Sequence, residues 1–348
     1  IVLWGKYPVS DSIQGMLKER YGIEAAFYVD SNEGKIDHYH VFSPQCLVGK
    51  SQEYYLVIPV AFYQSLKDKL TKWGYKKDAD YYYFADCIVC HTSDYYEDSH
   101  GNKIVGIHQG LKFAFSGFNS EIRIGKQVHI YESTIYIHSS GKVIIGDLAD
   151  LSQSTICAQD GVQISIGDRT EMKQSIINAE NHSEVIIGEG CFLRELPMTL
   201  KSNASMILGH DTKIDSQVGN WSIFDGAKVE IGSRGRFIKG YLVAASNSLI
   251  KVGNDFSIMW TYQIVADEDT SIIIGDDCMA SYDVMVRSGD GHSIFDLNTG
   301  ENMNSTKEIS KLRKTVIGDH VWIGMRSIIL YRSEIGSGSI IGAASLVK

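Results

Sequence analysis

The chain has 348 residues, of which 44% are hydrophobic and 22% are charged. This composition is typical of a folded globular protein and excludes a wholly disordered one. The 33 Lys and Arg are outnumbered by 42 Asp and Glu, and the formal net charge of −9 argues against a large nucleic-acid-binding surface. No apolar run approaches the ~20 residues of a membrane-spanning helix and no signal peptide is visible, so we expect a cytoplasmic protein without a transmembrane segment.

Residues 1–90 alternate short apolar strands with helical segments. Strands are expected over 1–4, 25–29 and 54–59, and helices over 10–21 and 61–73. Such alternation predicts a parallel sheet, hence a small Rossmann-like α/β domain over residues 1–108, with 91–112 as the junction. Asp30 ends the second strand, where a nucleotide-binding sheet places an acid for a ribose, but the first turn lacks two of the three fingerprint glycines. Binding of a nucleotide, recognition of a nucleotide-linked sugar, and simple packing all remain open for this domain.

A repeat of aliphatic-Gly pairs occupies the rest of the chain. Eight pairs follow one another at steps of 21, 21, 21, 21, 23, 21 and 22 residues, at Ile124-Gly125, Ile145-Gly146, Ile166-Gly167, Ile187-Gly188, Leu208-Gly209, Ile231-Gly232, Val252-Gly253 and Ile274-Gly275. A further aliphatic residue usually stands two places earlier, which predicts a strand with one buried face. The glycine is expected to supply a backbone conformation that residues with a Cβ resist.

The spacing near the end of the chain indicates the underlying period. After Ile274 the pairs are 43, 6, 12 and 6 residues apart, at Ile317, Ile323, Ile335 and Ile341. Multiples of six predict a parallel β-helix of hexapeptide repeats, in which short strands form triangular coils. We expect a mainly β protein with roughly ten coils, about 50 Å long, over residues 109–348 and beginning near Ile122. The alternative, a β-sandwich of repeated hairpins, would not keep so constant a spacing.

The 43-residue step contains an insertion. A regular coil uses 21 residues, so about 22 are added after the expected strand at 284–287. Long loops that leave a rigid scaffold are often functional. The insertion begins Ser288-Gly-Asp-Gly-His292 and holds no other histidine, which makes His292 the candidate catalytic residue.

Three motifs in this part of the chain resemble the hexapeptide acyltransferases. They are Ser288-Gly-Asp-Gly-His292-Ser-Ile-Phe-Asp296, Ile317-Gly-Asp-His-Val-Trp322-Ile-Gly324 and Ile335-Gly-Ser-Gly-Ser-Ile-Ile-Gly-Ala-Ala-Ser-Leu-Val347. Their order is similar to that in the branch containing galactoside, maltose and polysialic acid O-acetyltransferases. The detailed resemblance covers residues 272–348, whereas the upstream coils share only the architecture.

The resemblance implies a left-handed β-helix that forms a homotrimer and uses acetyl-CoA as co-substrate. Acetyl-CoA would lie in the cleft between two neighbouring solenoids. His292 would be the general base, since an imidazole with its ordinary pKa near 6.5 can take a proton from a sugar hydroxyl at neutral pH. The resulting alkoxide would attack the thioester directly, and backbone N–H groups would hold the oxyanion.

The resemblance also implies a cofactor surface. Trp322 would lie against the catalytic histidine and the pantetheine arm of the cofactor. Gly324, Ala343 and Ala344 belong to the elements along which that arm approaches the backbone, and Lys348 would meet a phosphate of CoA.

Three other residues near the motifs have less defined roles. Asp290 or Asp296 is expected to orient His292, although an aspartate beside a turn is often only a turn residue. His320 stands where the family usually has Asn or another polar residue, and we interpret it as non-catalytic.

The sequence thus predicts an O-acetyltransferase that modifies a carbohydrate acceptor, a capsule or lipopolysaccharide sugar, in the cytoplasm or at the inner face of the membrane beside polysaccharide-assembly enzymes. The first alternative is an N-acetyltransferase for a nucleotide-linked amino sugar, because such enzymes also join an α/β domain to a β-helix. Their catalytic histidine lies within the coils, where Asn181-His182 is a poor match. The second alternative, an inactive β-helix scaffold, is disfavoured by the presence of His292 and Trp322.

Overall fold

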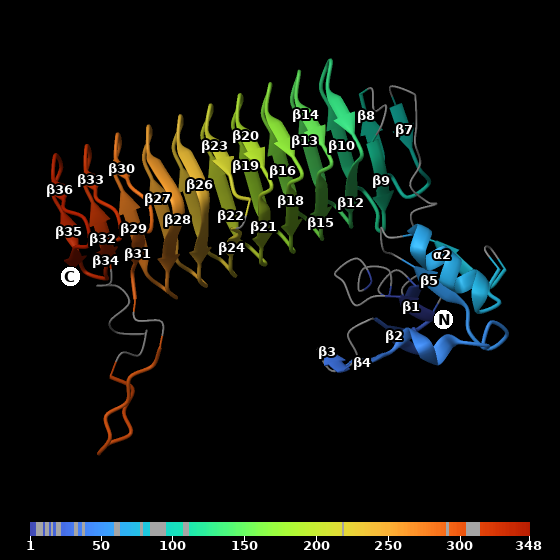
Figure 1. The fold of residues 1–348 in the computed structure, drawn as a ribbon. Helices are drawn as coiled ribbons and strands as arrows, with labels where there is room; N and C mark the ends of the chain where they lie inside the picture. The colour runs from blue at the N-terminus through green and yellow to red at the C-terminus, as the bar shows by residue number, and fades with distance from the viewer. Residues whose placement is uncertain are drawn as a thin grey trace.

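A computed structural model describes residues 1–4, 10, 14, 17–18, 22–30, 34–36, 39–58, 63–76, 79–83, 95–106, 111–217, 219–289, 292–303 and 314–348. Within these ranges, a small α/β domain lies at one end of a long parallel β-solenoid (Figure 1). The predicted fold class, mainly β with a parallel β-helix after an α/β unit, is confirmed.

The α/β domain is built on a six-stranded sheet with the order β3-β4-β2-β1-β5-β6. Its elements are β1 (Val2–Trp4), β2 (Phe27–Val29), β3 (Gly34–Ile36), β4 (Tyr39–Phe42), the 3₁₀ helix η1 (Pro44–Leu47), β5 (Leu56–Ile58), α2 (Tyr63–Lys72) and β6 (Tyr81–Tyr83). Only the β3–β4 pair is antiparallel. Because β1 lies between β2 and β5, the order is that of a doubly wound sheet. The predicted strands and second helix are confirmed, and a nucleotide at Asp30 stays a prediction.

The solenoid has three faces. The first is a sheet whose parallel strands are β8 (Lys103–Val105), β10 (Glu121–Ile124), β13 (Lys142–Ile145), β16 (Gln163–Ile166), β19 (Glu184–Ile187), β22 (Ser205–Leu208), β25 (Lys228–Ile231), β27 (Leu249–Val252), β29 (Ser271–Ile274), β32 (Lys314–Ile317) and β35 (Glu334–Ile335).

The other two faces are continuous with each other, because two long strands run from one face to the next. The second face contains β11 (His129–Tyr131), β14 (Asp150–Ser152), β17 (Glu171–Lys173), β20 (Phe192–Arg194), β23 (Lys213–Asp215), the first halves of β26 (Arg236–Ala244) and β28 (Ser257–Ala266), β30 (Met279–Ala280), β33 (Trp322–Ile323) and β36 (Ile340–Ile341). The third contains β9 (Leu111–Phe115), β12 (Ser133–Ile137), β15 (Thr155–Ala158), β18 (Ile176–Ala179), β21 (Pro197–Leu200), β24 (Trp221–Ile223), the second halves of β26 and β28, β31 (Met285–Arg287), β34 (Ile328–Ile329) and β37 (Leu346–Val347).

The core consists of aliphatic side chains that stack on their counterparts in the next coil. Ile145 pairs with Ile166 and Ile166 with Ile187, and all three are buried. The alternation in each strand places one residue inside and the next outside, as the sequence predicts. Each fully buried aliphatic side chain stabilises the fold by about 1.5–3 kcal/mol, so the coils adhere through a continuous apolar interior.

The repeated glycine serves close packing of the corners, and the expectation that it supplies an unusual backbone conformation is wrong. Gly146 is absent from the residues with positive φ, whereas Leu148, two places later, has φ 60°. A Cβ on Gly146 would lie 2.6 Å from the backbone nitrogen of Asp168 in the next coil. Only a residue without a Cβ allows the corners to stack this closely.

The solenoid sheets also begin earlier than expected. The strand β7 (Tyr95–Glu97) forms an antiparallel hairpin with β8, and Ile104 of β8 pairs with Ile122. Residues 95–106 are therefore a hairpin at the end of the sheet and not merely a junction. Ala114 of β9 packs in one apolar cluster with Leu3 and Val57 of the α/β domain. The division of the chain at residue 108 into two folding units stays a prediction.

Replacing Gly146 by Ala is expected to lower the free energy of unfolding by about 1–3 kcal/mol, the usual cost of overpacking. Gly336→Ala is the matched control, because Gly336 belongs to the same kind of Ile-Gly pair but its added Cβ would meet nothing closer than Ser339 Oγ at 4.0 Å. Urea denaturation of the two variants checks this. Equal stability losses would contradict the packing role of the corner glycines.

Candidate functional site

The insertion that carries His292 is fixed to the solenoid at both ends. It leaves after β31 on the third face and returns before β32 on the first, so it occupies the corner between these faces. Ser288 is buried, and its hydroxyl accepts a hydrogen bond of 3.1 Å from the backbone N–H of Asp267. At the other end, the buried Thr315 hydroxyl donates to the Arg287 carbonyl oxygen at 2.9 Å.

Beyond this root, the insertion forms a hairpin that projects from the body of the solenoid (Figure 1). Phe295 and Asn302 form an antiparallel bridge. The Asp296 carboxylate accepts hydrogen bonds from the backbone N–H groups of Thr299 and Asn298, both at 2.8 Å. These two bonds hold the pKa of Asp296 below its usual value. The carboxylate of Asp296 is thus engaged in closing the hairpin turn.

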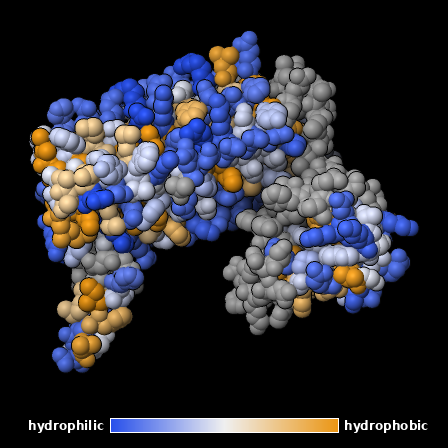
Figure 2. Space-filling view, in the orientation of Figure 1, coloured by the Kyte–Doolittle hydropathy of each residue, from blue (hydrophilic) through white to orange (hydrophobic). Residues whose placement is uncertain are grey.

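The projecting hairpin exposes apolar side chains. Ile294, Phe295, Leu297 and Met303 are all exposed, and Leu297 reaches 99%. Orange surface accordingly covers much of the hairpin (Figure 2). His292 is exposed at its base. Apolar side chains grouped on a projecting segment are typical of a surface that packs against another molecule.

Trp322 lies on the second face, beside an open groove of about 500 Å³ at the corner with the first face. Trp322 pairs in register with Met279 on one side and Ile340 on the other, and all three side chains face outward. The Ile340 side chain is 70% exposed. The three side chains form an apolar ladder across three coils. The groove therefore offers an apolar wall to an elongated ligand.

The same groove holds a histidine–carboxylate pair that the sequence analysis did not identify. Nδ1 of His320 lies 2.7 Å from Oδ2 of Asp277, and both residues line the groove with Trp322. The 43 residues between Asp277 and His320 equal the step from Ile274 to Ile317, so the repeat itself places them in adjacent coils. That signal could have found the pair.

Gly324, Ala343 and Ala344 come together at the corner between the second and third faces. A Cβ on Gly324 would lie 2.6 Å from the backbone nitrogen of Ala343, so this glycine permits close stacking of the last coils. Ala343 and Ala344 are exposed, and the Ala344 N–H donates to the Met325 carbonyl oxygen at 2.8 Å. The small side chains leave the backbone at this corner open to a ligand.

The remaining predicted residues are not brought to this surface. Lys348 is exposed and lines a separate cavity of about 390 Å³ with Leu330, Tyr331 and Arg332. Asp290 lies outside the described residues. In the described ranges no group of His, Cys, Asp and Glu is arranged to hold a metal ion, and no described helix is long and apolar enough to cross a membrane.

Comparisons with known proteins address the repeat and its relatives. Residues 314–348 match the family model for the bacterial transferase hexapeptide (six repeats). These last coils are thus similar to bacterial transferase hexapeptide repeats. The chain is 36% identical over 93 residues to a polysialic acid O-acetyltransferase of Escherichia coli O1:K1 / APEC, covering 27% of this chain and 28% of the relative. It is 37% identical over 68 residues to the polysialic acid O-acetyltransferase of Neisseria meningitidis, covering 20% and 29%.

The aligned stretches thus span less than a third of the two curated relatives, and those relatives are acyltransferases. A solved polySia-specific acetyltransferase is similar at 23% identity over 61% of this chain and 71% of that chain, with a TM-score of 0.33. The predicted resemblance to the hexapeptide acyltransferases is confirmed by the family model and the two relatives.

The hairpin turn should resist acid down to an unusually low pH. Because the pKa of Asp296 is lowered from 3.8, the bonds that its ionised form accepts are present above that value and are lost only as pH falls through the lowered pKa. An NMR titration should give a midpoint below 3.8 for the Asp296 carboxyl carbon, with the Thr299 and Asn298 amide protons shifting in the same step. A midpoint at or above 3.8 would show that the turn does not form in solution.

Proposed function

We propose that the protein is an acetyl-CoA-dependent O-acetyltransferase that modifies a hydroxyl of a bacterial surface polysaccharide. The main support for this proposal is the hexapeptide segment at 314–348, in which Trp322 lies beside an open groove. The chain that contains this segment is also related to two polysialic acid O-acetyltransferases. The proposed location is the cytoplasm, since acetyl-CoA is a metabolite of that compartment. Polysialic acid is the first acceptor to test.

The second face and its corners suit the cofactor arm. Trp322 and its apolar neighbours would contact the pantetheine chain, while Gly324, Ala343 and Ala344 allow the arm to approach the backbone. Lys348 would meet a CoA phosphate, and it shares its cavity with a second cation, Arg332. Bound acetyl-CoA would supply the thioester whose carbonyl carbon is attacked.

The acceptor hydroxyl would be activated by His292. Its imidazole would take the hydroxyl proton as the new C–O bond forms, and would return that proton to the sulfur as the C–S bond breaks. Backbone N–H groups of the facing coil would hold the oxyanion. No acyl-enzyme is needed in this scheme, because the acceptor oxygen attacks directly.

The geometry favours a site shared between chains. In a triangular coil, the corner between the third and first faces, where the His292 hairpin leaves, is opposite the second face, where Trp322 lies. The hairpin projects outward with exposed apolar side chains, and the second face exposes an apolar ladder. Packing the hairpin of one chain on the second face of its neighbour would cover both surfaces, and a closed ring of three copies would repeat this contact.

His292→Ala should lower kcat by about 100-fold or more, the usual worth of a general base, and should change the KM for acetyl-CoA little. His320→Asn is the matched control, since Asn tolerates the left-handed backbone at this corner, where φ is 58°. CoA thiol release with polysialic acid as acceptor measures both. Retained activity in His292→Ala together with loss in His320→Asn would assign the base to the His320–Asp277 pair instead.

Mixed oligomers test the shared site. Trp322→Ala should weaken both the binding of acetyl-CoA and the rate. When His292→Ala and Trp322→Ala chains are co-expressed, random assembly gives about a quarter of the interfaces both intact residues, so a corresponding share of activity should return. Sedimentation of a fully active monomer, or no recovery in confirmed mixed oligomers, would contradict the shared site.

The alternative acceptor is an amino group. Acetylation of amino-sugar nucleotides in preference to polysialic acid would favour an N-acetyltransferase. The doubly wound strand order of the α/β sheet supports this alternative, because sheets of that order often bind nucleotides.

A further inference from the structure

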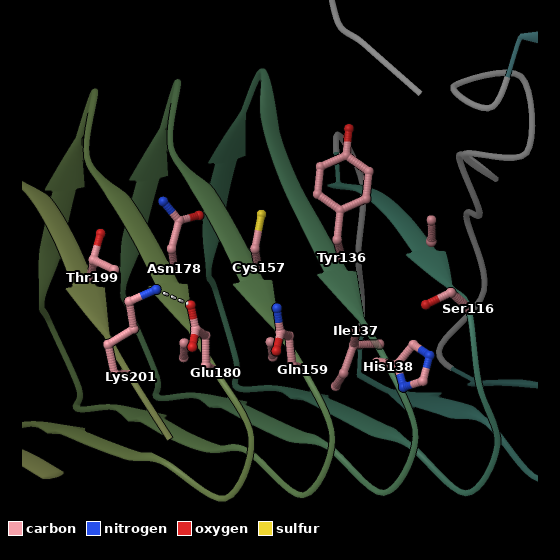
Figure 3. Close-up of a pocket in the computed structure, with 13 residues that line it drawn as sticks. Ser116, Tyr136, Ile137, His138, Cys157, Gln159, Asn178, Glu180, Thr199 and Lys201 are labelled. Carbon is pink, nitrogen blue, oxygen red and sulfur yellow. Dashed lines mark hydrogen bonds and ion pairs between the residues drawn. The ribbon is translucent and has the colours of Figure 1, made fainter. Parts of the chain in front are cut away.

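A further cavity lies on the third face of the solenoid, near the α/β domain. It has a volume of about 230 Å³, and strands β12, β15, β18 and β21 border it (Figure 3). Ala114 and Tyr136 line it and also pack in the apolar cluster that includes Leu3 of the α/β domain. The coil of β21 is five coil steps from that of Trp322, about 24 Å along the axis. The cavity is therefore separate from the proposed transfer site.

Two straight rows of side chains border this cavity, because the parallel strands pair in register. One row is Tyr136, Cys157, Asn178 and Thr199, and the other is His138, Gln159, Glu180 and Lys201. Between the rows, Ala158 and Ala179 turn inward to the core, so strand backbone alone separates the two lines of outward side chains and forms the floor of a trough. With ~4.8 Å between coils, each row extends about 14 Å. A trough of this shape fits a linear polymer that lies along the solenoid axis.

The rows offer donors and acceptors at fixed positions. The ammonium group of Lys201 lies 2.6 Å from the Glu180 carboxylate, and His138 is paired with Asp160. The Asn178 amide adds both a donor and an acceptor. Since the charged groups are already paired, the trough does not require a strongly charged ligand. Its mixture of hydroxyl, amide and paired charges suits a molecule that is rich in hydroxyl groups.

The Cys157 thiol in the trough can contact a ligand but is not activated for reaction with it. Burial raises the pKa of Cys157 to about 12, so the thiol is protonated at neutral pH and is neither a nucleophile nor a ready metal ligand. The trough therefore has the character of a binding site.

The edge row leads along the solenoid to the root of the insertion. The strand register carries the position of Lys201 through Phe224 and Asp267 to Gly289, directly after Ser288, where the insertion with His292 begins. Phe224 is itself exposed, which adds an aromatic surface to this path. A chain that lies in the trough is thus directed toward the segment that carries the proposed base.

We propose that this trough binds a segment of the acceptor polysaccharide and holds the polymer while a distant part of it reaches the transfer site. The identity of the polymer rests on the proposed function, whereas the binding of a glycan chain at this place does not. The trough is a second contact for the polymer, separate from the groove beside Trp322.

A binding experiment with two double variants tests the proposal. Asn178→Ala combined with Lys201→Met removes polar groups from both rows without touching the α/β contact. Its control, Gln153→Ala combined with Lys173→Met, removes an amide from the corner that follows the second face and a Glu-paired lysine from that face. The probes are long-chain polysialic acid, dextran and free sialic acid, measured by affinity electrophoresis and calorimetry.

We expect the wild type and the control to bind at least one of the two polymers, and the trough variant to bind it at least 10-fold more weakly. In transfer assays, the trough variant should have a raised KM for the polymer, with kcat and the KM for acetyl-CoA unchanged. Equal binding by the trough variant and the wild type, or no polymer binding by the wild type, overturns the proposal. Loss of binding in the trough variant of a protein without transferase activity would support the trough and refute the proposed function.

Discussion

The in-register stacking of coils is the constraint on which the rest of this molecule depends. Each coil repeats the positions of the one before it, and the corner glycines let neighbouring backbones approach so closely that a Cβ at Gly275 would lie 2.7 Å from the backbone nitrogen of Asp319. A slip of one residue would turn the buried aliphatic side chains outward, so the register is strongly enforced. Outward-facing residues consequently form straight rows along the axis. The apolar ladder of Met279, Trp322 and Ile340 and the polar rows of the trough are both products of that register.

The proposed transfer site lies where the register is interrupted or where a face of the solenoid is left uncovered. The insertion breaks the repeat at one corner, and the buried hydroxyls of Ser288 and Thr315 hold its two ends in place. The hairpin can therefore project without disturbing the coils beneath it. Because its root is opposite the Trp322 face, assembly of copies would be a chemical requirement of the proposed reaction rather than an addition to stability. The same proposed contact would cover the exposed side chains of Leu297 and Ile340.

The part of the fold that the sequence predicts is the part in which hydrophobic residues recur at a regular spacing. The strands that end in a regularly spaced aliphatic-Gly pair were predicted correctly. The strand β8 was missed because its pair, Val105-Gly106, is shifted by one residue from the repeat, and Ile104 rather than Val105 stacks inward on Ile122. The role of the corner glycines was mistaken, since a sequence does not distinguish an unusual φ from a lack of space. The sequence located His292 in the insertion but not the direction of the hairpin, which depends on the hydrogen bonds at its root.

The two rows of side chains along the trough are aligned by the repeat, although the sequence alone did not identify them as one surface. His138, Gln159, Glu180 and Lys201 stand 21 residues apart, so their alignment was implicit in the Ile-Gly spacing, yet nothing in the residue types marks them as one surface. Their value comes from rigidity. A solenoid hydrogen-bonded on three faces keeps the trough and the root of the insertion at a constant separation, so a polymer held at the first is at high effective concentration near the second. A free sugar gains nothing from that arrangement, and a long glycan gains most, which is the selectivity that an enzyme acting on an assembled polysaccharide requires.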